Sequence, residues 1–165
     1  YIQPLGCMDE KLMIMPGALG GSSPMDDADR IRVELVREWE KEPIVELYRA
    51  GGWWKDGMDA SRIGQLIKGS FLFAVAIDIS TGNSVGMGRV ISDGIADAYI
   101  QDFVVLPAWR SSGVGMRILS ALLEGCRAAG IKWVGLIAEP GTSKFYRSMG
   151  FAPMEGHIPM LFSGR

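Results

Sequence analysis

Hydrophobic residues change their spacing several times along the chain, and each change predicts a different element. Between residues 31 and 36 apolar and polar side chains alternate, which is the period-two pattern of a half-buried strand. Residues 43–51 and 59–69 instead place apolar residues at helical spacing, the first stretch opened by a proline and both closed by a glycine. The first part of the chain therefore predicts a strand followed by two short helices.

The middle of the chain carries three nearly continuous apolar runs, at residues 71–77, 85–91 and 99–106. Short turn signals separate these runs, Thr81-Gly82-Asn83 and Ser92-Asp93-Gly94. Strands joined by such short turns pair antiparallel, so the three runs predict a meander.

An amphipathic helix is predicted from near Ser112 to near Gly130, because apolar residues recur there at three- and four-residue spacing. Residues 133–138 predict another strand and residues 142–149 another helix. The chain from residue 151 onward, including residues 158–162, is expected to supply closing strands. The fold class is therefore mixed α/β, with antiparallel strands first and a strand–helix–strand crossover later.

Composition indicates one globular domain, because 165 residues and 48% hydrophobic content suffice for a single core. We place this domain at residues 30–165. Residues 1–29, with a linker-like stretch at 16–24, are expected to form an N-terminal arm that lies against this chain or a neighbouring copy. A net charge of −2 does not favour a general nucleic-acid binder.

The counts of special residues exclude further classes of protein. One histidine, His157, and two widely spaced cysteines, Cys7 and Cys126, do not suit a metal cluster or a disulfide scaffold, so no metal is expected. No apolar run reaches about 18 residues, so no membrane span is expected and a cytoplasmic location is predicted.

The segment Arg110-Ser111-Ser112-Gly113-Val114-Gly115 lies between a predicted strand end and a predicted helix start. Free backbone N–H groups and the positive end of the helix dipole make such a place an anion site, and Arg110 adds a fixed charge. The alternative is that both glycines only let the helix pack close to a strand. Gly86-Met87-Gly88 is merely a fragment of a dinucleotide fingerprint.

Two motifs resemble those of a known family. Residues 104–115, Val-Val-Leu-Pro-Ala-Trp-Arg-Ser-Ser-Gly-Val-Gly, are similar to the acetyl-CoA motif of the GNAT superfamily of N-acetyltransferases, (Arg/Gln)-x-x-Gly-x-(Gly/Ala) after an apolar strand. Residues 145–151, Phe-Tyr-Arg-Ser-Met-Gly-Phe, resemble its second motif. The resemblance covers residues 31–162. It implies a mixed, mostly antiparallel central sheet with splayed central strands and helices on both faces.

The resemblance implies that acetyl-CoA is the cosubstrate, with its pyrophosphate on the loop and its pantetheine arm between the strands near Val105 and Leu136. The residues implied in binding it are Phe103, Val104, Val105, Arg110, Ser111, Ser112, Gly113, Val114, Gly115, Met116 and Tyr146. Glu139 and Thr142 depart from the family pattern, which has Asn and Ala there, and this puts one pantetheine contact in doubt.

Two residues are implied in catalysis. Tyr146 matches the family's general acid, and a phenol is protonated at neutral pH; the alternative is an ordinary core aromatic. Asp102 is a carboxylate inside an apolar strand, where it either orients the acceptor amine, accepts its proton through water, or pairs with an arginine. Simple alternation places Tyr99, Gln101, Phe103 and Val105 on one face and Asp102 on the other, unless a β-bulge breaks the parity.

Other residues are candidates for the acceptor side, where Trp53 and Trp54 form either an aromatic wall or core plugs under a loop. Tyr99, Asp93 and Glu46 also stay open as acceptor-site residues. The acceptor is a small-molecule or peptide amine, and a homodimer is possible. Cys126 is expected to be buried and inert, which favours direct attack in a ternary complex. The alternatives are a non-catalytic acyl-CoA-binding or sensing module and an unrelated nucleotide-phosphate binder.

Overall fold

The computed structural model describes residues 30–164, so the arm expected at residues 1–29 lies outside the described residues. Strands and helices alternate in the order that the hydrophobic spacing predicts. The elements are β1 (Ile31–Leu35), α1 (Lys41–Ala50), a 3₁₀ turn (Ala60–Arg62), α2 (Ile63–Gly69), β2 (Leu72–Asp78), β3 (Ser84–Ser92), β4 (Asp97–Val105), a 3₁₀ turn (Pro107–Trp109), α3 (Val114–Ala128), β5 (Trp133–Leu136) and α4 (Ser143–Ser148).

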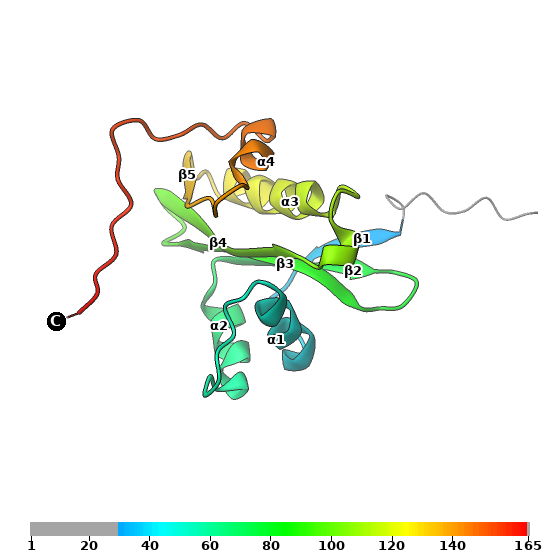
Figure 1. The fold of residues 1–165 in the computed structure, drawn as a ribbon. Coiled ribbons are helices and arrows are strands. Elements are labelled where there is room, and N and C mark those ends of the chain that lie inside the picture. The colour runs from blue at the N-terminus through cyan, green and yellow to red at the C-terminus, as the bar shows by residue number, and fades with distance from the viewer. Residues whose placement is uncertain (1–29, 165) are drawn as a thin grey trace, which may run out of the picture.

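The strands form one open sheet in the order β1-β2-β3-β4-β5 (Figure 1). The first four strands are antiparallel neighbours, which confirms the predicted meander. β5 runs parallel to β4, and α3 makes the crossover between them. The mixed, mostly antiparallel sheet is thus confirmed.

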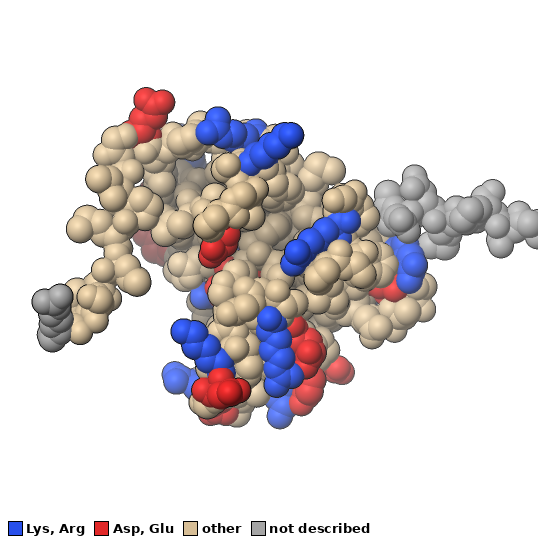
Figure 2. Space-filling model, viewed as in Figure 1, with Lys and Arg blue, Asp and Glu red and all other residues tan. Residues whose placement is uncertain are grey.

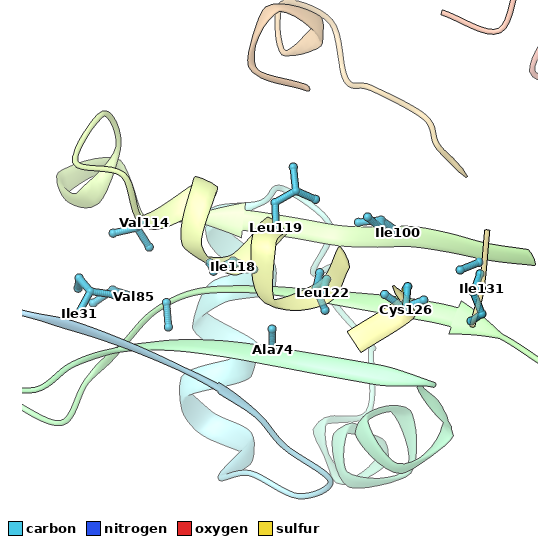
Figure 3. Close-up of a cluster of buried hydrophobic side chains, with 13 residues drawn as sticks. Ile31, Ala74, Val85, Ile100, Val114, Ile118, Leu119, Leu122, Cys126 and Ile131 are labelled. Atoms are coloured by element: carbon cyan, nitrogen blue, oxygen red, sulfur yellow. The ribbon is translucent and has the colours of Figure 1, made fainter. Parts of the chain in front are cut away.

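The helices cover both faces of the sheet, with α3 and α4 on one side and α1 and α2 on the other (Figure 1). The apolar stripe of α3 is buried against the sheet, as the close-up in Figure 3 shows for Ile118, Leu122 and Cys126, which are drawn between Ile100 and Ala74 of the sheet. A second cluster joins Ile44, Leu47 and Ile67 of α1 and α2 to the other face. Two cores therefore hold the sheet between them.

The two glycines of β3 lie beneath α3 and allow its close approach. A Cβ atom on Gly86 would stand 2.9 Å from Ile118 Cδ1, and one on Gly88 would stand 2.8 Å from Phe103 Cδ2. Real Cβ atoms do not approach other atoms so closely, so these positions need glycine for packing. The fragment Gly86-Met87-Gly88 is therefore part of the core between sheet and helix.

The closing strands predicted after residue 151 are wrong for the described residues. Residues 151–164 form no strand, and the sheet ends at β5. Apolar alternation indicates that a segment can pair, but a strand forms only where an edge lies within its reach. The segment leaves the body of the molecule instead (Figure 1). As a consequence, β4 and β5, predicted as splayed central strands, lie at the end of the sheet.

Candidate functional site

A β-bulge interrupts β4 at the point where the site begins. In the pairing of β3 with β4, Met87 faces Val104 while Arg89 faces Gln101, so Gly88 stands opposite two residues. One of them, Asp102, has a φ of 50°, in the left-handed region. The extra residue moves the following side chains to the other face of the sheet.

The bulge corrects the face assignment that simple alternation gives. Phe103 and Val105 pack in the α3 cluster together with Ala98 and Ile100, not together with Tyr99 and Gln101. Asp102 instead lies on the side of α1. The bulge thus puts Asp102 on the α1 face and Phe103 on the α3 face, each opposite to the face that alternation from Ile100 would give it.

Asp102 is held by two donors, Tyr48 and Arg89, that the sequence did not identify. Its Oδ2 accepts a 2.7 Å hydrogen bond from the Tyr48 hydroxyl and an ion-paired hydrogen bond from Arg89 Nε. The side chains of Arg89 and Asp102 are only 17% and 23% exposed. The contacts therefore show the pairing with an arginine that the sequence left open, whereas a catalytic role of Asp102 stays a prediction.

Tyr48 is a neutral donor in this network. Burial, followed by its hydrogen bond to Asp102, raises the pKa of the Tyr48 hydroxyl well above its usual range. Trp53 and Trp54 pack around it, with ring centroids 6.2 and 6.4 Å from that of Tyr48, and both donate their backbone N–H to its carbonyl. The two tryptophans thus support the tyrosine that holds Asp102.

A signal for Arg89 exists in the sequence. It is a charged residue inside the apolar run 85–91, as Asp102 is inside its own run, and two such opposite charges on neighbouring strands suggest a pair. Tyr48 carries no comparable signal, because a tyrosine on the apolar stripe of a helix is commonly core.

β4 and β5 separate immediately beside the bulge. Their parallel pairing covers Asp97–Ile100 and Trp133–Leu136. Beyond Ile100, β4 continues to Val105 beside β3 but without β5. Leu106 donates its N–H to Val85 across the antiparallel ladder, so Val105, its neighbour, turns its backbone groups away from β3. Arg110 Nε donates to the Val105 carbonyl at 3.0 Å. The splayed edge therefore presents backbone groups, one of them bonded to an arginine.

The loop after β4 leads directly into the N-terminus of α3. Ser111 and Gly113 have φ values of 64° and 83°, and Gly113 is the residue that caps the helix. The first backbone N–H groups of a helix have no partner within it, which here concerns Val114 and the two residues after it. The first turn of α3 carries no acidic residue. This end of the helix is therefore suited to an anion.

The two glycines of this loop serve different purposes. A Cβ on Gly113 would meet only Met116 Cε, at 3.8 Å, so this glycine supplies a positive φ beside open space. A Cβ on Gly115 would stand 3.3 Å from Phe145 Cζ, so this glycine lets α4 pack against α3. The hypothesis that these glycines only allow close packing of the helix therefore fits Gly115 but not Gly113.

The other residues implied in cofactor binding differ in exposure. Arg110, Ser111 and Met116 are exposed, and the Ser112 hydroxyl donates to the Trp109 carbonyl at 2.7 Å. Val104 and Val114 are buried, so only their backbone atoms are available to a ligand.

Tyr146 lies among aromatic rings on the α3 face. Its ring centroid is 5.1 Å from that of Phe145, 6.0 Å from Phe151 and 6.1 Å from Phe103. Burial, and then the negative charge of Glu139, raise the pKa of its hydroxyl above the ordinary value. The phenol is therefore protonated at neutral pH. Tyr146 thus packs on Phe103 of β4, and Asp102 lies on the opposite face of the same strand.

The remaining acceptor-side candidates are spread over the molecule. Asp93 accepts N–H groups of its own turn, and Glu46 pairs with Arg49. Tyr99 packs beside Trp133 on β5. A groove of about 880 Å³ lies between the start of α1 and the β2–β3 turn, lined by Glu38, Glu40, Glu42 and Glu46 among others. It contains neither Asp102 nor Tyr146, so we do not identify it with the site.

Within residues 30–164, no helix is long and apolar enough to cross a membrane. In the same residues, no three His, Cys, Asp or Glu side chains gather as a metal site would require. Cys126 is buried, and the loss of solvent raises the pKa of its thiol, so the predicted burial is confirmed.

Comparison with known proteins agrees with this geometry. Residues 68–153 match the family described as the acetyltransferase (GNAT) domain. Serotonin N-acetyltransferase 2, chloroplastic, of Oryza sativa subsp. japonica is 36% identical over 73 residues, 44% of this chain and 36% of that protein. The uncharacterized N-acetyltransferase ycf52 of Pyropia yezoensis is 32% identical over 110 residues, 66% of this chain and 62% of that protein. The cytoplasmic location of this chain stays a prediction.

Solved structures share the fold. A GNAT family acetyltransferase from Streptococcus pneumoniae TIGR4 has a TM-score of 0.68 and 26% identity, covering 82% of this chain and 98% of that one. An aminoglycoside acetyltransferase from an uncultured soil metagenomic sample, with 19% identity and a TM-score of 0.69, covers 83% of this chain and 98% of that one and shows the fold alone. The matching motifs, the five-stranded sheet and the family match agree, and the chain belongs to the GNAT acetyltransferase family.

Proposed function

We propose that this protein transfers the acetyl group of acetyl-CoA to a primary amine by direct attack in a ternary complex. One observation carries the proposal: the part of β4 that β5 leaves unpaired carries Phe103, whose ring packs on Tyr146 and lies beside Gly115 in the first turn of α3. A single extended ligand can therefore contact the anion site with one end and reach the protonated phenol with the other.

The residues present fit acetyl-CoA. The open space at Gly113 and the free N–H groups that follow it suit a pyrophosphate, and Arg110 adds a positive charge beside it. The backbone edge of β4 beyond Ile100 suits the amides of the pantetheine arm, which would add to the sheet like a short strand. Because Arg110 already bonds the Val105 carbonyl, we expect the arm to use neighbouring groups of the strand.

The chemistry follows from these positions. The neutral amine attacks the acetyl carbonyl, and its nitrogen forms a new bond to carbon while the carbonyl oxygen becomes an oxyanion. A backbone N–H near Phe103 stabilises that oxyanion. The C–S bond then breaks, the thiolate of CoA leaves, and the Tyr146 phenol donates a hydrogen bond or a proton to it. The amine nitrogen loses its extra proton to solvent water, and solvent returns a proton to Tyr146 or to the thiolate, so the products are the acetamide and the CoA thiol.

Asp102 is proposed to face the acceptor amine. Arg89 and Tyr48 both bond Oδ2, so the carboxylate is held in one orientation and Oδ1 is the atom available to the amine or to a bridging water. A carboxylate fixed by two donors attracts a cationic amine and positions it.

The test is the release of the CoA thiol from acetyl-CoA in the presence of single amines. We choose an arylalkylamine such as serotonin, an aminoglycoside and a peptide with a free amino terminus, because similar proteins are named for the first two classes. Amine-dependent release, with acetylated amine found by mass spectrometry, supports the proposal. Saturable acetyl-CoA binding without release on any amine would instead support the non-catalytic acyl-CoA-binding module.

A further inference from the structure

Arg30 and Asp78 form an ion pair where β1 begins and β2 ends. Arg30 Nε donates to Asp78 Oδ1 and Arg30 Nη2 donates to Asp78 Oδ2, both at 2.8 Å, so the pair is bidentate. The Asp78 side chain is only 3% exposed, and it also accepts hydrogen bonds from the hydroxyls of Ser80 and Thr81. Because these contacts fix the carboxylate, they also fix the plane of the guanidinium that pairs with it.

The guanidinium of Arg30 also covers the ring of Trp109. Its Cζ atom lies 4.9 Å from the centroid of the indole ring, which is the geometry of a cation–π contact. Trp109 ends the 3₁₀ turn that precedes α3, and this turn lies beside the start of β1 (Figure 1). Arg30, Asp78 and Trp109 therefore join three segments that are far apart in sequence, at the loop before α3.

Trp109 is hydrogen-bonded to the chain on both sides of it. Its N–H donates to the Leu106 carbonyl at 2.9 Å, and its own carbonyl accepts the Ser112 hydroxyl at 2.7 Å. The two residues between Trp109 and Ser112, Arg110 and Ser111, are exposed. A displacement of Trp109 would therefore also move the loop that leads into α3.

The backbone of this loop needs support from its surroundings. Ser111 has a φ of 64°, in the left-handed region, which is costly for a residue with a side chain and persists only where other contacts hold it. Figure 2 shows blue side chains over α4 and beside the turn before α3, so positive charge is present on this face. Charge attracts an anion to the face, but only a fixed loop presents converging N–H groups to it.

We propose that Arg30, held by Asp78, is a positioning residue for acetyl-CoA. By holding the indole ring of Trp109, it keeps residues 110–113 in the conformation that receives the pyrophosphate before the ligand arrives. Because the loop is ordered in advance, binding does not carry the entropic cost of ordering it. The inference rests on the proposed function, since it gives Arg30 a role in binding the same cosubstrate.

Calorimetric titration of acetyl-CoA into two variants tests the proposal. Arg30→Lys keeps a positive charge beside Asp78 but cannot both form the bidentate pair and cover the indole ring. Trp109→Leu removes the ring and keeps an apolar side chain. Each variant is expected to raise the dissociation constant about 3- to 30-fold, which corresponds to the strength of a cation–π contact. The double variant should bind no more weakly than Trp109→Leu alone, because Arg30 acts through that ring.

Two matched controls leave this contact intact. Arg32→Lys changes an exposed arginine of β1 that pairs with Glu34. Trp39→Leu changes a tryptophan that packs in the core cluster on the α1 face, whereas Trp109 packs in the cluster on the α3 face. Both controls should bind acetyl-CoA with a dissociation constant close to that of the wild type.

The titration also separates positioning from stability, since the alternative is that the pair only fastens β1 to β2, where Ile31 faces Asp78. A partly unfolded variant would then bind at fewer sites per chain with the affinity of the wild type, which contradicts the proposal. Weaker binding at one site per chain in both variants, with wild-type affinity in both controls, supports it. Wild-type affinity in either variant, additive losses in the double variant, or an equal loss in Trp39→Leu contradicts it. If the wild type binds no acetyl-CoA, the proposed function fails and this inference fails with it.

Discussion

Replacing Tyr146 with phenylalanine isolates the proposed proton donor. The substitution removes one hydroxyl and keeps the ring that packs on Phe103, Phe145 and Phe151 at centroid distances of 6.1, 5.1 and 6.0 Å. The aromatic packing of α4 against β4 is therefore retained. We expect the free energy of unfolding and the dissociation constant of acetyl-CoA to stay close to their wild-type values.

The magnitude of the loss follows from the acidity of the two groups. Burial and Glu139 raise the pKa of Tyr146 above its ordinary value near 10, whereas an aliphatic thiol titrates near 8.5. Full transfer of the proton to the leaving thiolate is therefore uphill by about 2 kcal/mol or more. A hydrogen bond to the thiolate is the stabler arrangement. Such a charge-assisted bond contributes about 1.5–3 kcal/mol, which predicts a 10- to 150-fold fall in kcat.

The assay is steady-state release of the CoA thiol, with kcat and KM determined separately for Tyr146→Phe and the wild type. A fall of 10- to 150-fold in kcat with an unchanged KM for acetyl-CoA supports the reasoning. An unchanged kcat would remove the proposed role of the phenol. A loss above about 10⁴-fold would show that full proton transfer limits the reaction, contrary to the acidity argument.

Three further substitutions test the framework around the site. Gly88→Ala would set a Cβ 2.8 Å from Phe103 and should lower the free energy of unfolding in urea by about 1–3 kcal/mol; an unchanged midpoint would refute this packing. Asp102→Asn leaves Arg89 without its carboxylate and should cost about 1–3 kcal/mol while raising the KM of the amine; an effect on acetyl-CoA affinity alone would contradict the acceptor-side placement. Arg30 lowers the pKa of the buried Asp78 carboxyl, so this pair stabilises the protein above pH about 4, and the stabilisation is lost as the pH falls below it. Asp78→Asn should therefore flatten the fall of Tm in acid. An equally steep fall in the variant would show that the pair does not cause the acid sensitivity.

Much of the fold was predictable because its elements are local. Amphipathic spacing marked α3 within two residues at each end, and short turns after Asp78 and Ser92 marked the meander. The loop between β4 and α3 was predictable for the same reason, since a strand end, two glycines and a helix start are adjacent in sequence, whereas binding of an anion there stays a prediction. Each of these features is decided by neighbouring residues.

The rest depends on contacts between distant residues. Asp102 and Tyr48 are 54 positions apart, and only the bulge in β4 brings the carboxylate to the hydroxyl of α1. A bulge arises from the pairing of a strand with its neighbour, so the spacing of apolar residues within β4 alone does not predict it. Residues 158–162 have the composition of a strand, but a strand also needs an edge to pair with, and composition does not report whether one is within reach.

Calorimetric titration of acetyl-CoA tests the central claim most directly, because the proposed function requires the N-terminus of α3 to bind it. The wild type, Gly113→Val and Gly130→Val form the matched set. Gly113 precedes α3 and Gly130 follows it, with φ values of 83° and 81°, and a Cβ at either position would meet no atom closer than 3.8 Å, so both substitutions strain the backbone alike. Binding of one acetyl-CoA per chain to the wild type and Gly130→Val, but not to Gly113→Val, is predicted. No binding to the folded wild type, or equal binding to all three proteins, would contradict the account.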